Sequence, residues 1–167
     1  VMLGAIQYER HPAFVLLIAL GAAAVLTLHL VAGNREVKKD NSPFDPAVNG
    51  FVRVCDVNEI EDSRAKIFCV NSERIAVYRF GDTLYAIHNV CKHQGGPLGE
   101  GKIIDGCITC PWHGYQYLPN NGQSPPPFKE RVSTYDVRIE GNRVWLNPSP
   151  FPEGSERPGA VISQPSN

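Results

Sequence analysis

The sequence predicts an all-β domain of sandwich or small-barrel type over residues 51–147, preceded by one apolar helix. Short runs rich in β-branched and aromatic residues recur after residue 50, and turn residues separate them. No later segment keeps a helical hydrophobic period over three turns. The stretch from Pro12 to Leu30 has no charged residue and is mostly aliphatic. These three observations predict a helix followed by a β domain.

The composition indicates a folded globular protein with enough cysteines for a metal site. A chain of 167 residues suffices for one domain of roughly 100–150 residues with appendages. Hydrophobic residues make up 43% and charged residues 20%, which excludes global disorder. With 16 Lys plus Arg against 17 Asp plus Glu, we expect no nucleic-acid partner. Five cysteines are too few for a disulfide scaffold but sufficient for a metal site.

The N-terminal apolar stretch is long enough to predict a transmembrane helix over residues 12–33, after a flank of residues 1–11. A buried core helix and a signal peptide are the alternatives. One cation, Arg10, precedes the stretch, and three follow it at positions 35, 38 and 39. The positive-inside rule then predicts a single-pass membrane protein, with the lipid bilayer as a partner and the β domain on the cytoplasmic side.

A linker over residues 34–50, containing Pro43 and Pro46, leads into the β domain. Strands are expected at 51–54, 66–70, 74–80, 83–87, 132–139 and 143–146. Gly81-Asp82 and Gly141-Asn142 predict two hairpin turns. The segment 148–167 is rich in Pro and Ser, so we expect a tail that is disordered or extended along the domain or a partner.

Two short segments concentrate the residues that bind soft metals. Cys91-Lys92-His93 and Cys110-Pro111-Trp112-His113-Gly114 form a C-x-H, sixteen residues, C-x2-H pattern. Between them, residues 102–109 suit two short strands about an Asp105-Gly106 turn, which would return the second segment beside the first. Two Cys and two His suit one tetrahedral zinc or a two-iron, two-sulfide cluster. A C-x-H pair rarely chelates one ion, so the spacing favours the cluster.

This pattern resembles the signature of Rieske iron–sulfur proteins, and the β-rich frame resembles a Rieske domain. The resemblance implies one [2Fe-2S] cluster per chain, with Cys91 and Cys110 on the inner iron and His93 and His113 on the outer iron. The histidines would lie at an exposed tip, where electrons enter and leave. The run Pro125-Pro126-Pro127-Phe128 resembles the proline loop that covers the cluster in this family.

The resemblance also implies a subtype. Rieske proteins of the bc type carry one additional Cys in each loop, and these two residues form a disulfide. Here the corresponding places are Gly96 and Trp112. Tyr115 stands where that type has a hydrogen-bonding Ser, while Tyr117 keeps the second hydroxyl. We therefore expect the ferredoxin and oxygenase type and a reduction potential toward the low end of the Rieske range.

The expected function is a membrane-tethered one-electron carrier that exchanges electrons with a redox protein partner or belongs to a membrane redox complex. One alternative is the electron-transfer component of a multi-chain Rieske oxygenase. No His follows His113, so we expect no mononuclear iron domain and no catalytic residues in this chain. The other alternative is a structural zinc-binding interaction module.

Overall fold

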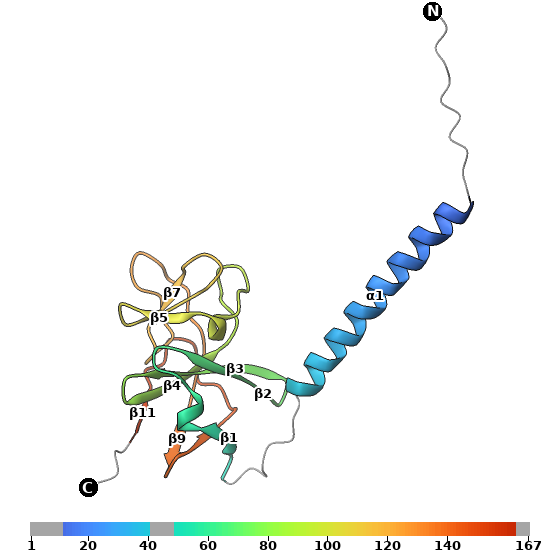
Figure 1. Cartoon of the computed structure of the whole chain (residues 1–167). Coiled ribbons are helices and arrows are strands. Elements are labelled where there is room, and N and C mark those ends of the chain that lie inside the picture. The colour runs from blue at the N-terminus through green and yellow to red at the C-terminus, as the bar shows by residue number, and fades with distance from the viewer. Residues whose placement is uncertain (1–11, 41–48, 163–167) are drawn as a thin grey trace, which may run out of the picture. The chain divides into compact units, whose positions relative to one another are not determined.

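The computed structural model describes residues 12–40 and 49–162, with side chains over 15–31 and 49–162 (Figure 1). The chain divides into an N-terminal helical unit and a C-terminal β unit, and each is described by itself. The predicted N-terminal flank, part of the predicted linker (41–48) and the last five residues of the predicted tail lie outside the described residues. The predicted domain boundaries stay predictions.

The described part of the N-terminal unit is the helix α1 (Pro12–Asp40). Its described side chains, over residues 15–31, are exposed. Among the residues that the structure describes, no helix combines the length and apolar character that a membrane span needs. The predictions of a transmembrane helix over 12–33, of a lipid bilayer partner and of single-pass membrane localisation are therefore wrong on this finding.

The C-terminal unit is built from three antiparallel sheets, which confirms a mostly β fold. One sheet has the order β1-β10-β9, a second has β11-β4-β3-β2 with β8 beside β4, and the third has β5-β6-β7. Two short 3₁₀ helices, η1 and η2, interrupt the strands. The bounds are β1 (Val52–Asp56), η1 (Val57–Glu59), β2 (Ala65–Val70), β3 (Glu73–Phe80), β4 (Thr83–His88), η2 (Leu98–Glu100), β5 (Lys102–Ile104), β6 (Cys107–Thr109), β7 (Gln116–Tyr117), β8 (Thr134–Tyr135), β9 (Val137–Glu140), β10 (Arg143–Leu146) and β11 (Ala160–Val161).

The predicted hairpins are confirmed. β3 pairs with β4 across Gly81-Asp82, β9 with β10 across Gly141-Asn142, and β5 with β6 across Asp105-Gly106. The predicted strand 132–139 is instead two strands that part at Asp136. β8 pairs with β4, whereas β9 pairs with β10, so this segment passes from one sheet to another. Both residues of β8 are buried, whereas β9 alternates half-buried and exposed side chains, and neither pattern indicates which sheet a strand joins.

The hydrophobic core has two parts, one on each face of the second sheet. Along β3, Ile75 and Val77 belong to the first part, while Ala76 and Tyr78 belong to the second. This follows from the alternation of side chains along a strand. The second part also contains residues of the third sheet, including Ile108 and Tyr117. In Figure 1 the β5–β7 sheet and its loops occupy one end of the unit, and β1 and β9 lie at the other.

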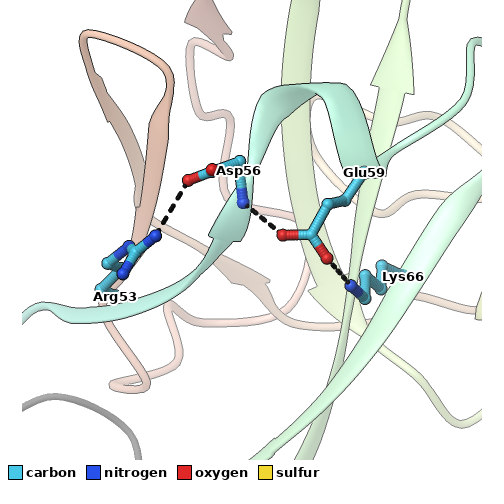
Figure 2. Close-up of polar contacts among 4 residues, drawn as sticks. All are labelled: Arg53, Asp56, Glu59 and Lys66. Carbon is cyan, nitrogen blue, oxygen red and sulfur yellow. Dashed lines mark hydrogen bonds and ion pairs between the residues drawn. The ribbon is translucent and has the colours of Figure 1, made fainter.

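A chain of polar contacts fastens η1 at the end opposite the third sheet (Figure 2). The Arg53 guanidinium pairs with the Asp56 carboxylate at 3.1 Å. The Asp56 backbone N–H donates to Glu59 Oε1 at 2.8 Å, and Lys66 of β2 donates to Glu59 Oε2. Glu59 therefore connects the strand before η1 to the strand after it. These contacts lower the pKa of Glu59, with the Lys66 hydrogen bond the largest cause.

Candidate metal centre

Two loops at the third sheet carry the predicted ligands, and each has the same backbone frame. In loop 1 (residues 91–96), the Cys91 N–H donates to the Gly96 carbonyl at 2.9 Å, and the Gly95 N–H donates to the Cys91 carbonyl at 2.8 Å. Gly95 has a φ of 78°, in the left-handed region where a side chain is unfavourable. The two bonds fold the loop back on its own cysteine.

Loop 2 (residues 110–115) repeats this frame. The Cys110 N–H donates to the Tyr115 carbonyl at 2.8 Å, and the Gly114 N–H donates to the Cys110 carbonyl at 3.0 Å. Gly114 has a φ of 71°. The two cysteines are therefore equivalent in the loops, although their histidines follow at different spacings.

The start of loop 1 is fixed by Asn89, which belongs to none of the predicted motifs. Asn89 is buried, and its side-chain oxygen accepts the Gly99 N–H at 2.7 Å. Its backbone carbonyl accepts the Leu98 N–H at 2.8 Å. Asn89 thus ties the end of β4 to η2, on either side of the loop. An amide side chain directly after an apolar strand was the only signal for this role in the sequence.

The two thiols form the buried part of the site. Cys91 is 2% exposed and Cys110 is 3% exposed, and the two side chains interact with each other. Burial raises the pKa of the Cys110 thiol, while the backbone N–H groups of Trp112 and His113 donate to its sulfur and oppose that rise. Backbone donors around buried sulfur suit a thiolate that binds metal.

The two imidazoles form the exposed part. The His93 and His113 side chains are exposed, and their ring centroids lie 5.2 Å apart with the planes at 88°. In the described part of the chain, no three or more His, Cys, Asp or Glu side chains gather around a position for one metal ion. The donors lie instead as a buried thiol pair and an exposed imidazole pair. Two soft and two borderline donors separated in this way fit a [2Fe-2S] cluster with mixed ligands.

Gly96 and Trp112, where the resemblance placed the missing disulfide, lie in contact. A Cβ at Gly96 would lie 2.8 Å from Cys110 Sγ and 3.1 Å from Trp112 Cδ2. The Trp112 side chain is 57% exposed, so it is not an ordinary core residue. None of the five cysteines, all within residues 49–162, forms a disulfide. The loops therefore meet here through packing of an indole ring on a glycine.

Tyr117 lies beneath loop 1. Its hydroxyl is 3.4 Å from Cys91 Sγ and accepts the Lys92 N–H at 3.0 Å. Burial, with a further contribution from Cys91, raises the pKa of Tyr117 well above its usual range, so the phenol stays protonated. It can therefore donate to the Cys91 sulfur, in keeping with the role expected for it.

Tyr115 contacts different partners. Its hydroxyl donates to the Glu130 carboxylate, and its ring lies against His93 and Phe128. The ring centroids of Tyr115 and Phe128 are 4.8 Å apart, so the predicted proline loop does reach this tyrosine. The role of Glu130 was not predicted, because the pairing spans fifteen residues and follows no sequence motif.

The remaining Cys and His residues have other surroundings. Cys69 in β2 and Cys107 in β6 are half-buried. Burial raises the pKa of the Cys55 thiol to about 12. His88 pairs with Glu73 across the β3–β4 hairpin at 3.4 Å.

Comparisons with known proteins agree with this geometry. A family described as the Rieske [2Fe-2S] domain matches residues 50–136. The anthranilate 1,2-dioxygenase ferredoxin subunit of Burkholderia cepacia is 33% identical over 92 residues, which cover 54% of this chain and 85% of that protein. The ferredoxin component of the alkene monooxygenase system of Xanthobacter autotrophicus is 27% identical over 107 residues, which cover 64% of this chain and 88% of that protein.

Among solved structures, the ferredoxin of carbazole 1,9a-dioxygenase from Nocardioides aromaticivorans superimposes with a TM-score of 0.55 at 28% identity. The superposition covers 59% of this chain and 98% of that ferredoxin. The similarity therefore extends over almost the whole length of that ferredoxin.

Proposed function

Since this chain belongs to the Rieske [2Fe-2S] domain family, we propose that it is a one-electron carrier, the ferredoxin component of an oxygenase system. The observation that carries the proposal is the match to 85% and 88% of the length of two proteins named as ferredoxins of such systems. The chain holds one [2Fe-2S] cluster, as its family does. When bound, the cluster accepts and releases single electrons.

Four residues would hold the cluster. Their side chains divide into a buried thiol pair and an exposed imidazole pair, and they are Cys91, Cys110, His93 and His113. The thiols would bind the inner iron because they are buried beneath the loops. The imidazoles would bind the outer iron, and their exposed edges would be the closest approach for a redox partner. This arrangement excludes water from one side of the site and leaves the other open to a protein partner.

The residues around the site support a reduction potential toward the low end of the Rieske range. Hydrogen bonds to cluster sulfur stabilise the more negative, reduced state. Tyr117 can donate to the Cys91 sulfur, but Tyr115 donates to Glu130 and is thereby directed elsewhere. One hydroxyl donor in place of two would lower the potential.

The test is electron paramagnetic resonance of the chemically reduced protein, with iron, zinc and sulfide measured on the same sample. We expect a Rieske-type signal with two irons and two sulfides per chain. His93→Ala and Cys110→Ser should abolish the signal and lower domain stability. His88→Ala and Cys69→Ser are the matched controls, because neither position is a proposed ligand, and both should keep full iron.

Two outcomes would contradict the proposal. A protein that contains one zinc and no sulfide would be a structural zinc module. A full iron and sulfide complement in His93→Ala or Cys110→Ser would remove that residue from the ligand set.

A further inference from the structure

Residues 148–162 form an extended segment, here named the strap, that lies beyond the residues that match the family. Its ends are attached to the second sheet. The Phe151 N–H donates to the Thr134 carbonyl at 2.9 Å, and the Ile162 N–H donates to the Asp82 carbonyl at 2.7 Å. Near the second attachment, β11 pairs with β4. The middle of the strap therefore lies between two points of attachment to the second sheet.

The middle of the strap contacts loop 1. Glu153 Oε1 lies 2.6 Å from Lys92 Nζ, and Lys92 directly follows Cys91. Both side chains are about half exposed, 46% for Lys92 and 45% for Glu153. The two residues also line a cleft of about 180 Å³ together with His88. This ion pair joins the strap to the backbone that carries a proposed ligand.

The strap also contacts the turn 118–123, which follows loop 2 and β7. The Arg157 N–H donates to the Asn120 carbonyl at 2.7 Å, and Gln123 Nε2 donates to the Gly154 carbonyl at 2.9 Å. Within the strap, the Arg157 guanidinium lies 3.3 Å from the centroid of the Phe151 ring. The strap therefore contacts both loop 1 and the turn 118–123 that follows loop 2.

Gly154 is the position that allows this approach. It has a φ of 81°, and a Cβ there would lie 2.8 Å from Arg131 Cδ and 3.2 Å from Gln123 Nε2. A side chain would strain this left-handed backbone and push on the Gln123 side chain that donates to the Gly154 carbonyl.

We propose that Glu153 and Gly154 are positioning residues, through which the strap holds loop 1 and the turn 118–123 in place and slows the loss of the cluster. The proposal rests on the proposed function, since it supposes a bound cluster. Opening of loop 1 must precede release of the metal, and the ion pair and hydrogen bonds of the strap oppose that opening. The strap would thus hold the two loops in place, since no disulfide joins them.

The first test compares Glu153→Gln with the wild type. The rate of cluster loss to an iron chelator, followed by visible absorbance, should rise about two- to fivefold, as expected for an exposed ion pair. In 1 M salt, where the Debye length is about 3 Å, the two proteins should lose the cluster at similar rates. Glu140→Gln, at the end of β9, removes the same charge and should leave the rate unchanged.

The second test uses Gly154→Ala, which changes no charge. Cluster loss should be about tenfold faster, in line with a left-handed residue that acquires a side chain. Gly141→Ala is the matched control, because Gly141 has a φ of 62° and nothing within 4 Å of the Cβ position. The amide hydrogens of residues 91–96 should exchange faster in Gly154→Ala and Glu153→Gln than in their controls. The midpoint potential of Gly154→Ala should differ from that of Gly141→Ala.

The outcomes separate the two proposals. If the wild type lacks iron and sulfide, the proposed function fails, and hydrogen exchange of loop 1 alone decides whether the strap positions it. If the wild type contains the cluster but both variants match their controls in cluster loss and exchange, the strap has no positioning role. Should Gly154→Ala not fold, Glu153→Gln still decides the question.

Discussion

The phenol ring of Tyr115 lies nearly parallel to the imidazole ring of His93, with the centroids 5.2 Å apart and the planes at 13°. Tyr115 is buried, whereas His93 is exposed. The Tyr115 hydroxyl donates to Glu130, and the Tyr115 ring contacts Phe128 from the proline-rich loop. A proposed ligand at the surface therefore rests on a tyrosine that is held by two other segments of the chain.

Tyr115→Ala should lower the free energy of unfolding and reduce the iron content. Loss of a buried aromatic side chain costs about 3–5 kcal/mol, and the His93 ring loses its support. Tyr115→Phe keeps the ring and removes one hydrogen bond, which costs about 1 kcal/mol and should preserve the iron. Denaturant unfolding and iron analysis of both variants measure these effects. Equal iron content in Tyr115→Ala and the wild type would show that the ring does not support His93.

Tyr117→Phe should lower the midpoint potential. The Tyr117 hydroxyl lies 3.4 Å from Cys91 Sγ, and a donor there stabilises the reduced state. A hydrogen bond of about 0.5–1.5 kcal/mol corresponds to about 20–60 mV for one electron. A redox titration followed by paramagnetic resonance measures the shift. Tyr85→Phe, at a half-buried position of β4, should leave the potential unchanged. An equal potential in both variants would remove Tyr117 from this role.

Gly96→Ala should release iron from an otherwise folded domain. The new Cβ would lie 2.8 Å from Cys110 Sγ and 3.1 Å from the Trp112 ring, so the two loops must separate. Overpacking of this kind costs about 1–3 kcal/mol. Gly106→Ala, with a φ of 78° but nothing within 4 Å of the Cβ position, strains the β5–β6 turn without a clash between the loops and should keep its iron. Iron content and circular dichroism of the two variants make the comparison, and full iron in Gly96→Ala would argue against close contact of the loops.

Glu59→Gln should reduce stability only above acidic pH. The contacts in Figure 2 lower the pKa of Glu59, so its carboxylate stabilises the fold above the ordinary value of 4.5. That contribution is lost as the pH falls through the lower folded-state pKa. Because Glu59 is largely exposed, we expect about 0.5 kcal/mol at pH 7 and no difference near pH 3.

Urea unfolding of wild type and Glu59→Gln between pH 3 and pH 7 measures this dependence. Glu61→Gln, two residues further on, should match the wild type throughout. A stability difference for Glu59→Gln that persisted at pH 3 would have to come from packing rather than charge.

Local sequence patterns predicted most of the strands. The β5–β6 hairpin depends on Asp105-Gly106, whose φ angles of 51° and 78° suit a tight two-residue turn. The conformation of such a turn depends on the residues within it, so the hairpin can be predicted from the sequence alone. The division at Asp136 could not be predicted in this way, since it depends on which sheet edge each half of the segment meets. The apolar N-terminal stretch predicted a helix correctly, but its predicted membrane span is wrong on the described residues.

Ligand spacing and turn residues are local properties of the chain, so the family, the mostly β fold and the two loops could be predicted from the sequence. How the loops meet is a matter of tertiary structure: Trp112 packs on Gly96, and Asn89 ties β4 to η2. The tertiary structure also decided that Glu130 takes the hydroxyl of Tyr115 and that Glu153 reaches Lys92 across sixty-one positions. These contacts join segments far apart in the chain, and their partners are chosen by the packing of the sheets rather than by any local pattern.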